Sequence, residues 1–188
     1  MRVIAGKHKG RHLTAHKGTE VRPTSDRVKE SVFSIIQDRV VEAKFLDLCA
    51  GTGNIGIEAL SRGAKQVAFL DKNLKCIRLI EQNLNVIGLD INQPEVQLIR
   101  EDAIQGINLF HQQSKSFELI YLDPPYDSDL YNQCLSYISD TSVLETTGIL
   151  LVEHRKHREL PSVYNLLRCY RIKQYGDTCL SFYRYEQK

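Results

Sequence analysis

The sequence lacks any apolar run long enough to cross a membrane. A membrane-spanning helix needs about 20 apolar residues, and the longest purely aliphatic stretch here is Ile149 to Val152. The amino terminus also lacks the apolar segment of a secretory signal, because Lys7, His8 and Lys9 interrupt it. These absences predict a cytoplasmic protein without a membrane partner.

Paired cysteines are missing as well. The five cysteines are scattered and contain no CxxC pair, which argues against a disulfide framework and against a zinc site. His154 and His157 have HxxH spacing, but they fall in the run EHRKHRE after an expected strand, with no third ligand nearby. We interpret that run as a charged loop, and we expect reduced, mostly buried thiols and no metal.

The chain also has no internal repeat and no low-complexity linker. Its 188 residues, of which 42% are apolar, suffice for one domain with a core. The net charge is only +2, but residues 1–29 hold eight Lys or Arg against two acids, so that segment carries +6 and the remainder −4. A basic arm on a mildly acidic body favours contact with nucleic-acid phosphates, although an ordinary solvated hairpin would have the same composition.

A glycine-rich turn follows the first strongly apolar strand. Residues 44–56 read KFLDLCAGTGNIG, a short strand that carries Asp47, then the turn, then a helix expected over Ile55 to Arg62. A strand, a glycine turn and a helix together form a nucleotide-binding unit. This segment therefore predicts a nucleotide or a nucleotide-like cofactor as ligand.

A dinucleotide site is one interpretation of this turn. Gly51, Gly53 and Gly56 satisfy GxGxxG, and Asp71 ends the next apolar stretch, QVAFLD. Asp47 argues against it, because a dinucleotide site usually keeps an apolar residue at that place in the strand. An acid there is better suited to the cationic amino or sulphonium group of S-adenosylmethionine.

A second motif closes a later strand. Asp123, Pro124, Pro125 and Tyr126 follow the apolar run Phe117 to Leu122, and proline ends a strand because it has no ladder donor. Tyr126 can stack on a base while Asp123 and the Pro124 carbonyl accept hydrogen bonds from an exocyclic amine. Hydride transfer needs no such loop. The competing interpretation is a Pro-Pro turn with an incidental acid.

Strand and helix patterns alternate through the rest of the chain, which predicts a parallel sheet. We expect strands ending at Asp71 and covering Val96–Arg100 and Gly148–Glu153, and helices over Leu74–Val86, Ile104–His111 and Leu130–Ile138. The tail differs, because Leu166–Tyr175 and Thr178–Tyr185 flank Gly176 and Asp177, a hairpin signature. At the amino end we expect a hairpin of Val3–Ala5 with Arg11–Thr14 and a helix from Thr24 or Ser25 to Val40.

These motifs together resemble a known superfamily. Asp47, Gly51, Gly53, Asp71, Asp102 in REDA, and the Asp-Pro-Pro-Tyr loop are similar to the motif series of class I S-adenosylmethionine-dependent methyltransferases that act on exocyclic amines. The segments MRVIAGKHKGRHL and RPTSDRVKESVF resemble one family within it, the bacterial small-subunit ribosomal RNA guanine methyltransferases that modify a 2-amino group. With these segments the resemblance spans essentially the whole chain.

The resemblance implies a fold and a division of the chain. The fold is α/β and Rossmann-like, with a seven-stranded, mostly parallel sheet, an antiparallel carboxyl-terminal hairpin and a small amino-terminal hairpin and helix. Residues 1–42 would be a basic extension that contacts RNA, and residues 43–188 the methyltransferase domain. The implied partner is 16S ribosomal RNA in an assembled or assembling small subunit, bound by a monomer.

Residue roles follow from the same resemblance. S-adenosylmethionine would be the cofactor, held by Asp47, Gly51, Gly53, Asn54, Asp71, Asp102 and Ala103. Asp71 would bind the ribose hydroxyls and Asp102 the adenine amino group, although either acid also suits a helix cap. Asp123, Pro124 and Tyr126 would orient the target amine, and substrate contacts would come from Arg2, Lys7, Lys9, Arg11, Arg22, Thr24, Arg27 and Pro125.

Two alternatives stay open at this point. One is methylation of another amine, such as the 6-amino group of adenine in DNA or in another RNA. An appendage of about forty residues is short for reading a DNA duplex, which favours a structured RNA instead. The other is a non-catalytic RNA-binding assembly factor. The acids Asp47, Asp71 and Asp123 argue against it, because a purely structural protein would not need all three.

Overall fold

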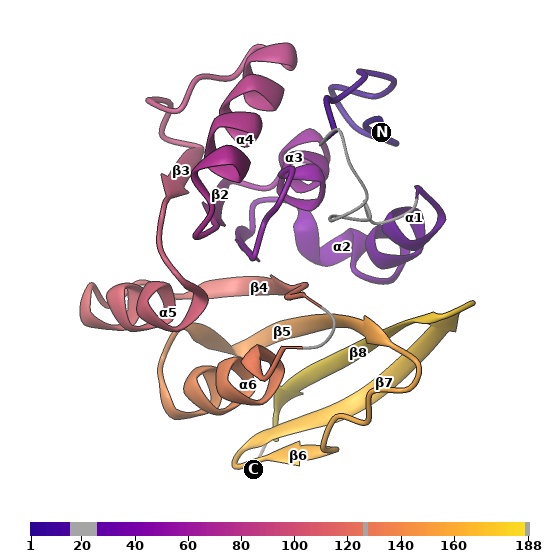
Figure 1. The fold of residues 1–188 in the computed structure, drawn as a ribbon, viewed down its shortest axis with the longest axis vertical. Coiled ribbons are helices and arrows are strands. Elements are labelled where there is room, and N and C mark those ends of the chain that lie inside the picture. The colour runs from indigo at the N-terminus through magenta and orange to yellow at the C-terminus, as the bar shows by residue number, and fades with distance from the viewer. Residues whose placement is uncertain (16–25, 126–127, 187–188) are drawn as a thin grey trace.

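The fold is known from a computed structural model that describes residues 1–15, 26–125 and 128–186 (Figure 1). The described chain forms one eight-stranded sheet in the order β3-β2-β1-β4-β5-β8-β7-β6. Five neighbouring strands are parallel: β1 (Lys44–Leu48), β2 (Gln66–Leu70), β3 (Val96–Ile99), β4 (Phe117–Leu122) and β5 (Leu144–Arg155). The helices that connect them are α3 (Asn54–Ser61), α4 (Leu74–Val86), α5 (Ala103–Gln112) and α6 (Leu130–Asp140). The predicted alternation and parallel sheet are confirmed.

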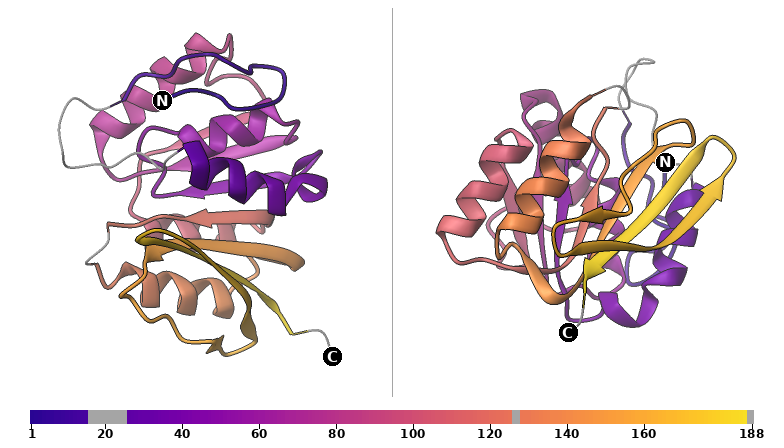
Figure 2. Two further views of the ribbon diagram at one scale, coloured as in Figure 1. Left: turned by 90° about the vertical axis from the view of Figure 1, so that its right-hand side faces the viewer. Right: turned by 90° about the horizontal axis from the view of Figure 1, so that it is seen from below.

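The parallel strands are buried on both faces, which explains why their sequences are almost continuously apolar. In β1, Phe45 belongs to the apolar cluster that includes residues of α3 and α4, whereas Leu46 and Leu48 belong to the cluster that includes α5 and α6. Figure 2, seen from below, shows α5 and α6 together on one side of the sheet. The sheet is therefore the middle layer of three.

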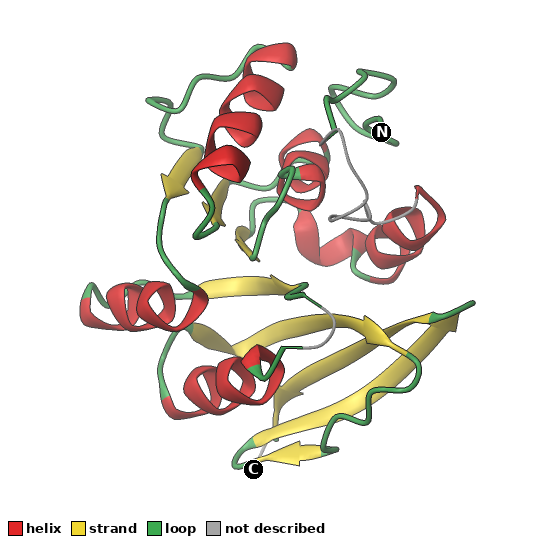
Figure 3. Ribbon diagram, in the orientation of Figure 1, coloured by secondary structure: helices red, strands yellow, loops and turns green. Residues whose placement is uncertain are grey.

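The carboxyl-terminal end of the sheet is antiparallel, as predicted. β8 (Thr178–Tyr185) pairs with β5, and β7 (Leu167–Tyr175) pairs with β8 (Figure 3). The sheet has an eighth strand that the expected seven did not include, β6 (Val163–Tyr164), which pairs with β7. Two residues are too few to show the alternating pattern that identifies a strand in a sequence.

The amino-terminal hairpin is smaller than predicted. Its only bridge within the described residues joins Arg2 and His12, and the Val3 amide donates to the Arg11 carbonyl at 2.9 Å. The amides of Ile4 and Ala5 donate instead to the two carboxylate oxygens of Glu58, at 2.8 and 3.0 Å. Glu58, on α3, thus accepts the hydrogen bonds that these two amides would otherwise donate to the opposite strand of a longer hairpin.

Glu58 is the centre of a buried polar cluster that fastens this segment to α3. The Lys29 ammonium lies 3.3 Å from one carboxylate oxygen, and the Arg62 guanidinium donates to the other at 2.8 Å. Lys29 is fully buried and also donates to the Arg2 carbonyl. Burial lowers the pKa of Lys29, and the charge of Glu58 opposes that shift.

The expected helix from Thr24 or Ser25 to Val40 is two helices, α1 (Asp26–Ile35) and α2 (Gln37–Val40). Its expected start lies outside the described residues. At Ile36 the backbone leaves the helical region, with φ −106° and ψ 12°. Val32, Ile36 and Val40 are nevertheless all buried, so the predicted apolar face is confirmed.

The amino-terminal segment shares the main core. Val3, Leu13 and Val32 belong to the same apolar cluster as Phe45 and Tyr121 of the sheet. The division at residue 42 therefore separates two expected roles, while the packing of the two parts is continuous. No helix in the described chain is both long and apolar enough to span a bilayer.

Candidate active site

A cavity of about 830 Å³ opens where the parallel strands end. This is the edge at which open α/β sheets bind ligands, and the volume lies within the usual range for small-molecule sites, about 300–1,000 Å³. Its wall takes residues from the segment after each strand in turn: Cys49 and Gly51 after β1, Asp71 after β2, Asp102 after β3, Asp123, Pro124 and Pro125 after β4, and Arg155 at the end of β5.

The glycine turn brings backbone to this wall. Gly51 and Gly53 have φ of +56° and +73°, in the left-handed region that glycine adopts at little cost. Gly56, on α3, serves a different purpose, because a Cβ there would lie 2.3 Å from the Phe69 ring. The third glycine of the motif thus allows close packing of helix on strand.

Asp71 holds the turn in place. Its carboxylate accepts from the Gly51 amide at 2.9 Å and from the Asn73 amide at 2.8 Å. The cap of α4 is Asn73, whose side chain accepts from the Lys75 amide, so helix capping is not what Asp71 does. A carboxylate offers about four acceptor positions, so Asp71 retains capacity for a ligand.

Asp102 is the amino-terminal cap of α5. One oxygen, Oδ1, accepts from the amides of Ile104 and Gln105, both at 3.0 Å. The capping role considered from the sequence is therefore present, and both of these hydrogen bonds use the same oxygen. Asp102 and the buried Ala103 line the cavity, which leaves Oδ2 available on the same wall as Asp71.

Asp47 and Asn54 lie behind the turn and are not part of the cavity wall. Asp47 is 2% exposed and accepts from the Gly56 amide at 2.8 Å. Burial raises the pKa of Asp47 to about 7, and the nearby charge of Asp71 adds to the shift. Asn54 is buried too, and its side-chain oxygen accepts from Lys29 at 2.7 Å. Asp47 thus holds the first turn of α3, and Asn54 joins that helix to Lys29 of α1.

Asp123 stands at the cavity wall just beyond β4. No donor among the described residues forms a hydrogen bond with its carboxylate. Burial raises the pKa of Asp123 well above its usual value, and the charges of Glu153 and Asp47 raise it further. This acid thus has acceptor capacity that no described residue uses.

The prolines after Asp123 also line the cavity. The Pro124 carbonyl accepts a hydrogen bond from the Tyr131 hydroxyl at 3.2 Å, and one of its two lone pairs remains. Tyr126, expected to stack on a base, lies outside the described residues. Tyr121, expected in the core, is 1% exposed, and its hydroxyl donates to the carboxylate of Glu153.

Sequence reasoning missed three residues around this loop: Tyr131, Glu153 and Arg155. Glu153 and Arg155 follow an apolar run on β5, so the rule that singled out Asp71 and Asp123 would have found them. Tyr131 had no comparable signal, because an aromatic residue near the start of a helix is ordinary core material.

The interpretation of His154 as part of a charged loop was wrong. Pairing with β8 extends β5 to Arg155, and His154 is buried with its Nε2 2.8 Å from the Ser181 hydroxyl. Burial lowers the pKa of His154. His157 lies beyond the strand and is exposed. Among the described residues, no group of three or more His, Cys, Asp or Glu is arranged to hold a metal ion.

The basic arm lies away from the cavity wall. Lys7, Lys9 and Arg11 are exposed and do not line it. Arg2 is exposed and pairs with Asp26 at 3.3 Å. Arg27 is exposed as well, and Arg22 and Thr24 lie outside the described residues. Substrate contact by this arm stays a prediction.

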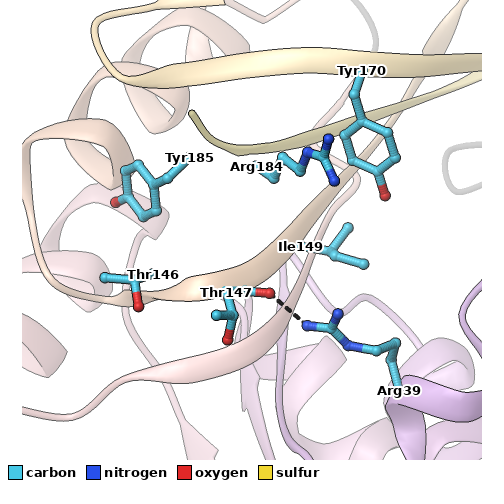
Figure 4. Close-up of a pocket in the computed structure, with 7 residues that line it drawn as sticks. All are labelled: Arg39, Thr146, Thr147, Ile149, Tyr170, Arg184 and Tyr185. Carbon is cyan, nitrogen blue, oxygen red and sulfur yellow. Dashed lines mark hydrogen bonds between the residues drawn. The ribbon is translucent and has the colours of Figure 1, made fainter. Parts of the chain in front are cut away.

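A second, smaller cavity of about 180 Å³ lies near the start of the parallel part of β5 (Figure 4). Its lining includes Arg39, Arg184, Tyr170 and two threonines. The Arg39 guanidinium donates to the Thr147 carbonyl at 2.5 Å, and Arg184 stacks 4.8 Å from the centroid of the Tyr170 ring. Both arginines are thus engaged by the protein, and the acids of the larger cavity have no counterpart here.

The sheet order, its antiparallel end and the acid-lined cavity together define the Rossmann-like methyltransferase fold, as predicted. A solved structure titled "Putative methyltransferase yhhF from Escherichia coli" is similar over 100% of this chain and 99% of that one, with a TM-score of 0.85 and 26% identity. The purely parallel dinucleotide domain considered from the sequence does not fit an edge built from β8, β7 and β6.

The chain belongs to the family described as "Conserved hypothetical protein 95", whose model matches residues 1–184. It is 38% identical over 184 residues to "Putative rRNA methyltransferase YlbH" of Bacillus subtilis, covering 98% of each chain. It is 32% identical over 170 residues to "Ribosomal RNA small subunit methyltransferase D" of Haemophilus influenzae, covering 89% of this chain and 86% of that one. The resemblance inferred from the sequence is confirmed.

Proposed function

We propose that this protein transfers a methyl group from S-adenosylmethionine to the exocyclic 2-amino group of a guanine in small-subunit (16S) ribosomal RNA. The observation that carries the proposal is that one cavity is lined both by the acids after β2 and β3 and by the Asp-Pro-Pro segment after β4. Asp71 and Asp102 lie on one part of the wall, and Asp123 and Pro124 on another. The names of the relatives support the class of reaction and the class of RNA.

The cavity fits the cofactor by the chemistry of its wall. Asp71 keeps acceptor positions for ribose hydroxyls, and Oδ2 of Asp102 faces no described donor and suits an adenine amino group. Gly51 has no side chain, so the cofactor can come close to its backbone. Asp47 and Asn54 do not line the cavity, so they would act on the methionine part through the first turn of α3, where Asp47 accepts from the Gly56 amide. When bound, S-adenosylmethionine supplies an activated methyl group to a nucleophile.

Asp123 and Pro124 would orient the nucleophile, which is the 2-amino group of the target guanine. The lone pair of the guanine 2-amino group is delocalised into the ring. Hydrogen bonds from that amine to the Asp123 carboxylate and the Pro124 carbonyl localise the lone pair and hold it in line for attack. As positive charge develops on the nitrogen, Asp123 accepts the proton that leaves. Tyr126 would stack on the base.

The ionised form of Asp123 favours guanine over adenine. Guanine offers N1–H and two amino hydrogens on one edge, and these match the two carboxylate oxygens and one carbonyl oxygen. Adenine presents the N1 lone pair at the equivalent place, where it would face a carboxylate oxygen with no proton between them. An unpaired acceptor in a buried site is costly.

The substrate would be presented from a structured particle. The target base must leave any helix to reach Asp123, and the arm with Lys7, Lys9 and Arg11 would contact phosphates around it. An assembled or assembling small ribosomal subunit in the cytoplasm provides such a surface. Nothing in the described site requires a second copy of the chain, and we propose that the protein works as a monomer.

The test is a labelling experiment. Purified protein is incubated with methyl-labelled S-adenosylmethionine and small ribosomal subunits from cells lacking this gene, and the RNA is digested to nucleosides. We expect label in 2-methylguanosine. Label in methyladenosine would replace the proposal with the adenine alternative. Binding of RNA and cofactor without any transfer would favour a non-catalytic assembly factor.

A further inference from the structure

The large cavity is short of cations for a site that must accept a nucleotide. Its described wall carries the acids Asp71, Glu101, Asp102 and Asp123 but only two cations, Lys72 and Arg155. Lys72 follows Asp71, which we assign to the cofactor, so Arg155 is the cation left for the substrate. A nucleotide whose base lies at Asp123 brings a phosphate one sugar away, and that phosphate needs a cation.

Arg155 begins a turn, residues 155–158, whose backbone is fixed at several points. Arg155 pairs with Thr178 in the ladder between β5 and β8. The Lys156 amide donates to the Asp177 carbonyl at 3.0 Å, and its ammonium lies 3.1 Å from the Asp177 carboxylate. The Arg158 amide donates to the Arg155 carbonyl at 3.0 Å. The turn is thus held at a set position on the rim.

The same turn is joined to the catalytic loop by a buried aromatic ring. The Arg158 guanidinium lies over the Tyr131 ring, with its carbon 4.5 Å from the ring centroid. Tyr131 is fully buried, and its hydroxyl donates to the Pro124 carbonyl at 3.2 Å. Arg158, Tyr131 and Pro124 therefore form a chain of contacts that fixes the distance between the turn and the amine-binding loop.

We infer that the turn of residues 155–158 is a phosphate-binding element for the target nucleotide, with Arg155 as the residue that contacts the phosphate. This inference rests on the proposed function, because it takes the base at Asp123 as given. Lys156 and Arg158 belong to the same turn but do not line the cavity. Arg155 is exposed and lines the cavity. A guanidinium is suited to this task because it binds phosphate through two parallel hydrogen bonds.

The experiment measures RNA binding without turnover. Small ribosomal subunits from cells lacking this gene are titrated with wild-type protein, Arg155→Ala, Arg155→Lys and the control Lys173→Ala over a series of salt concentrations. Lys173 is exposed on β7 and does not line the cavity. Loss of one phosphate contact reduces the slope of log affinity against log salt by about 0.7–0.9.

We expect Arg155→Ala to weaken binding about tenfold and to lose about one unit of salt slope, as for a single phosphate contact. Arg155→Lys should keep the wild-type slope while binding more weakly, because it keeps the charge and loses the bidentate geometry. In turnover assays Arg155→Ala should raise KM for the RNA and leave kcat nearly unchanged. Cofactor affinity, measured in parallel, reports that each variant is folded.

Equal salt slopes for Arg155→Ala, Lys173→Ala and wild type would overturn the inference. So would a loss of kcat in Arg155→Ala with the slope unchanged, because Arg155 would then position the catalytic loop instead of binding phosphate. If wild type binds the subunits but methylates no guanine, the proposed function fails, and the salt slopes still decide whether Arg155 contacts a phosphate.

Discussion

The large cavity has two parts: the proposed cofactor half, with Asp71 and Asp102, and the proposed substrate half, with Asp123. They differ in whether the protein itself donates hydrogen bonds to these acids. In the cofactor half, Asp71 accepts from the amides of Gly51 and Asn73, and Asp102 accepts from those of Ile104 and Gln105. In the substrate half, Asp123 has no donor among the described residues. The first pair stabilises the backbone that forms the site, whereas Asp123 keeps acceptor capacity that we propose the substrate amine uses.

This difference has an electrostatic counterpart. Burial and the charges of Glu153 and Asp47 raise the pKa of Asp123, so its ionised form is held at a cost in free energy. An amine hydrogen-bonded to the carboxylate would relieve that cost, most of all when the amine becomes positively charged. Asp71 and Asp102 have backbone donors without any ligand, whereas we propose that Asp123 gains its donor from the reacting amine.

The largest effect should come from Asp123→Asn. The substitution keeps the size of the side chain, removes the charge and turns an amide NH₂ toward the amine. We expect kcat to fall about 10³-fold, the usual scale for losing a positioned acid or base, with cofactor affinity unchanged. Single-turnover methylation and calorimetric cofactor binding check this. Full activity would show that the Asp123 carboxylate is not needed to orient the amine or to accept its proton.

Asp71→Ala should mainly weaken cofactor binding, whereas Asp123→Asn should mainly lower kcat. It removes the acceptor for the Gly51 amide and the proposed ribose contact. Hydrogen bonds to a charged group are worth about 1.5–3 kcal/mol, so cofactor affinity should fall about 10- to 100-fold, with a smaller change in kcat at saturating cofactor. Asp90→Ala is the matched control, because Asp90 is exposed and its carboxylate bonds only Asn92 among the described residues. A kcat defect alone would contradict the assignment.

The smallest effect is a shift of the pH profile. Asp123 acts as a carboxylate, so activity should rise with pH through its raised pKa. Glu153→Gln removes a neighbouring negative charge, which lowers the pKa of Asp123, so the acidic limb should move toward lower pH. The profile of kcat against pH measures this. Glu101→Gln, an exposed acid of the cofactor half, should leave the limb in place.

The pKa of Asp123 also affects stability, with a defined sign. The folded protein holds a proton on this group at pH values where the unfolded chain has lost it. The contribution of Asp123 to stability is therefore most favourable below the unfolded pKa and declines as pH rises toward the folded value. Glu153→Gln should reduce that decline in urea titrations at several pH values, in keeping with its effect on activity.

Much of this architecture could be predicted from the sequence. The glycine turn, the helix Leu74–Val86 and the strand that ends before Asp123 follow from local patterns, and the edge at which ligands bind follows from the parallel sheet. What failed depended on contacts between distant parts of the chain. The hairpin of residues 3–5 was shortened by Glu58, and His154 became part of a strand because β8 pairs with that segment.

The site was less predictable than the fold for the same reason. That acids lie at strand ends is visible in the sequence, but which of them is satisfied is not. Asp47 and Asn54 were assigned to the cofactor from their positions in the motif, yet the structure places them behind the turn. Tyr131 contacts Pro124 only because α6 folds back beneath the loop, and no spacing in the sequence encodes that.

The fastening of the amino-terminal segment to Glu58 has a consequence for synthesis. Residues 1–15 leave the ribosome before their partners on α3, which follow more than fifty positions later, with a separation of 54 residues between Ile4 and Glu58. The acceptor of the Thr14 amide is made later still, because Asn83 lies 69 positions away. Until α3 and α4 emerge, the amides of Ile4, Ala5 and Thr14 lack the acceptors that they have in the folded protein. This basic segment is therefore incompletely docked next to a ribosome while the rest of the chain is still being made.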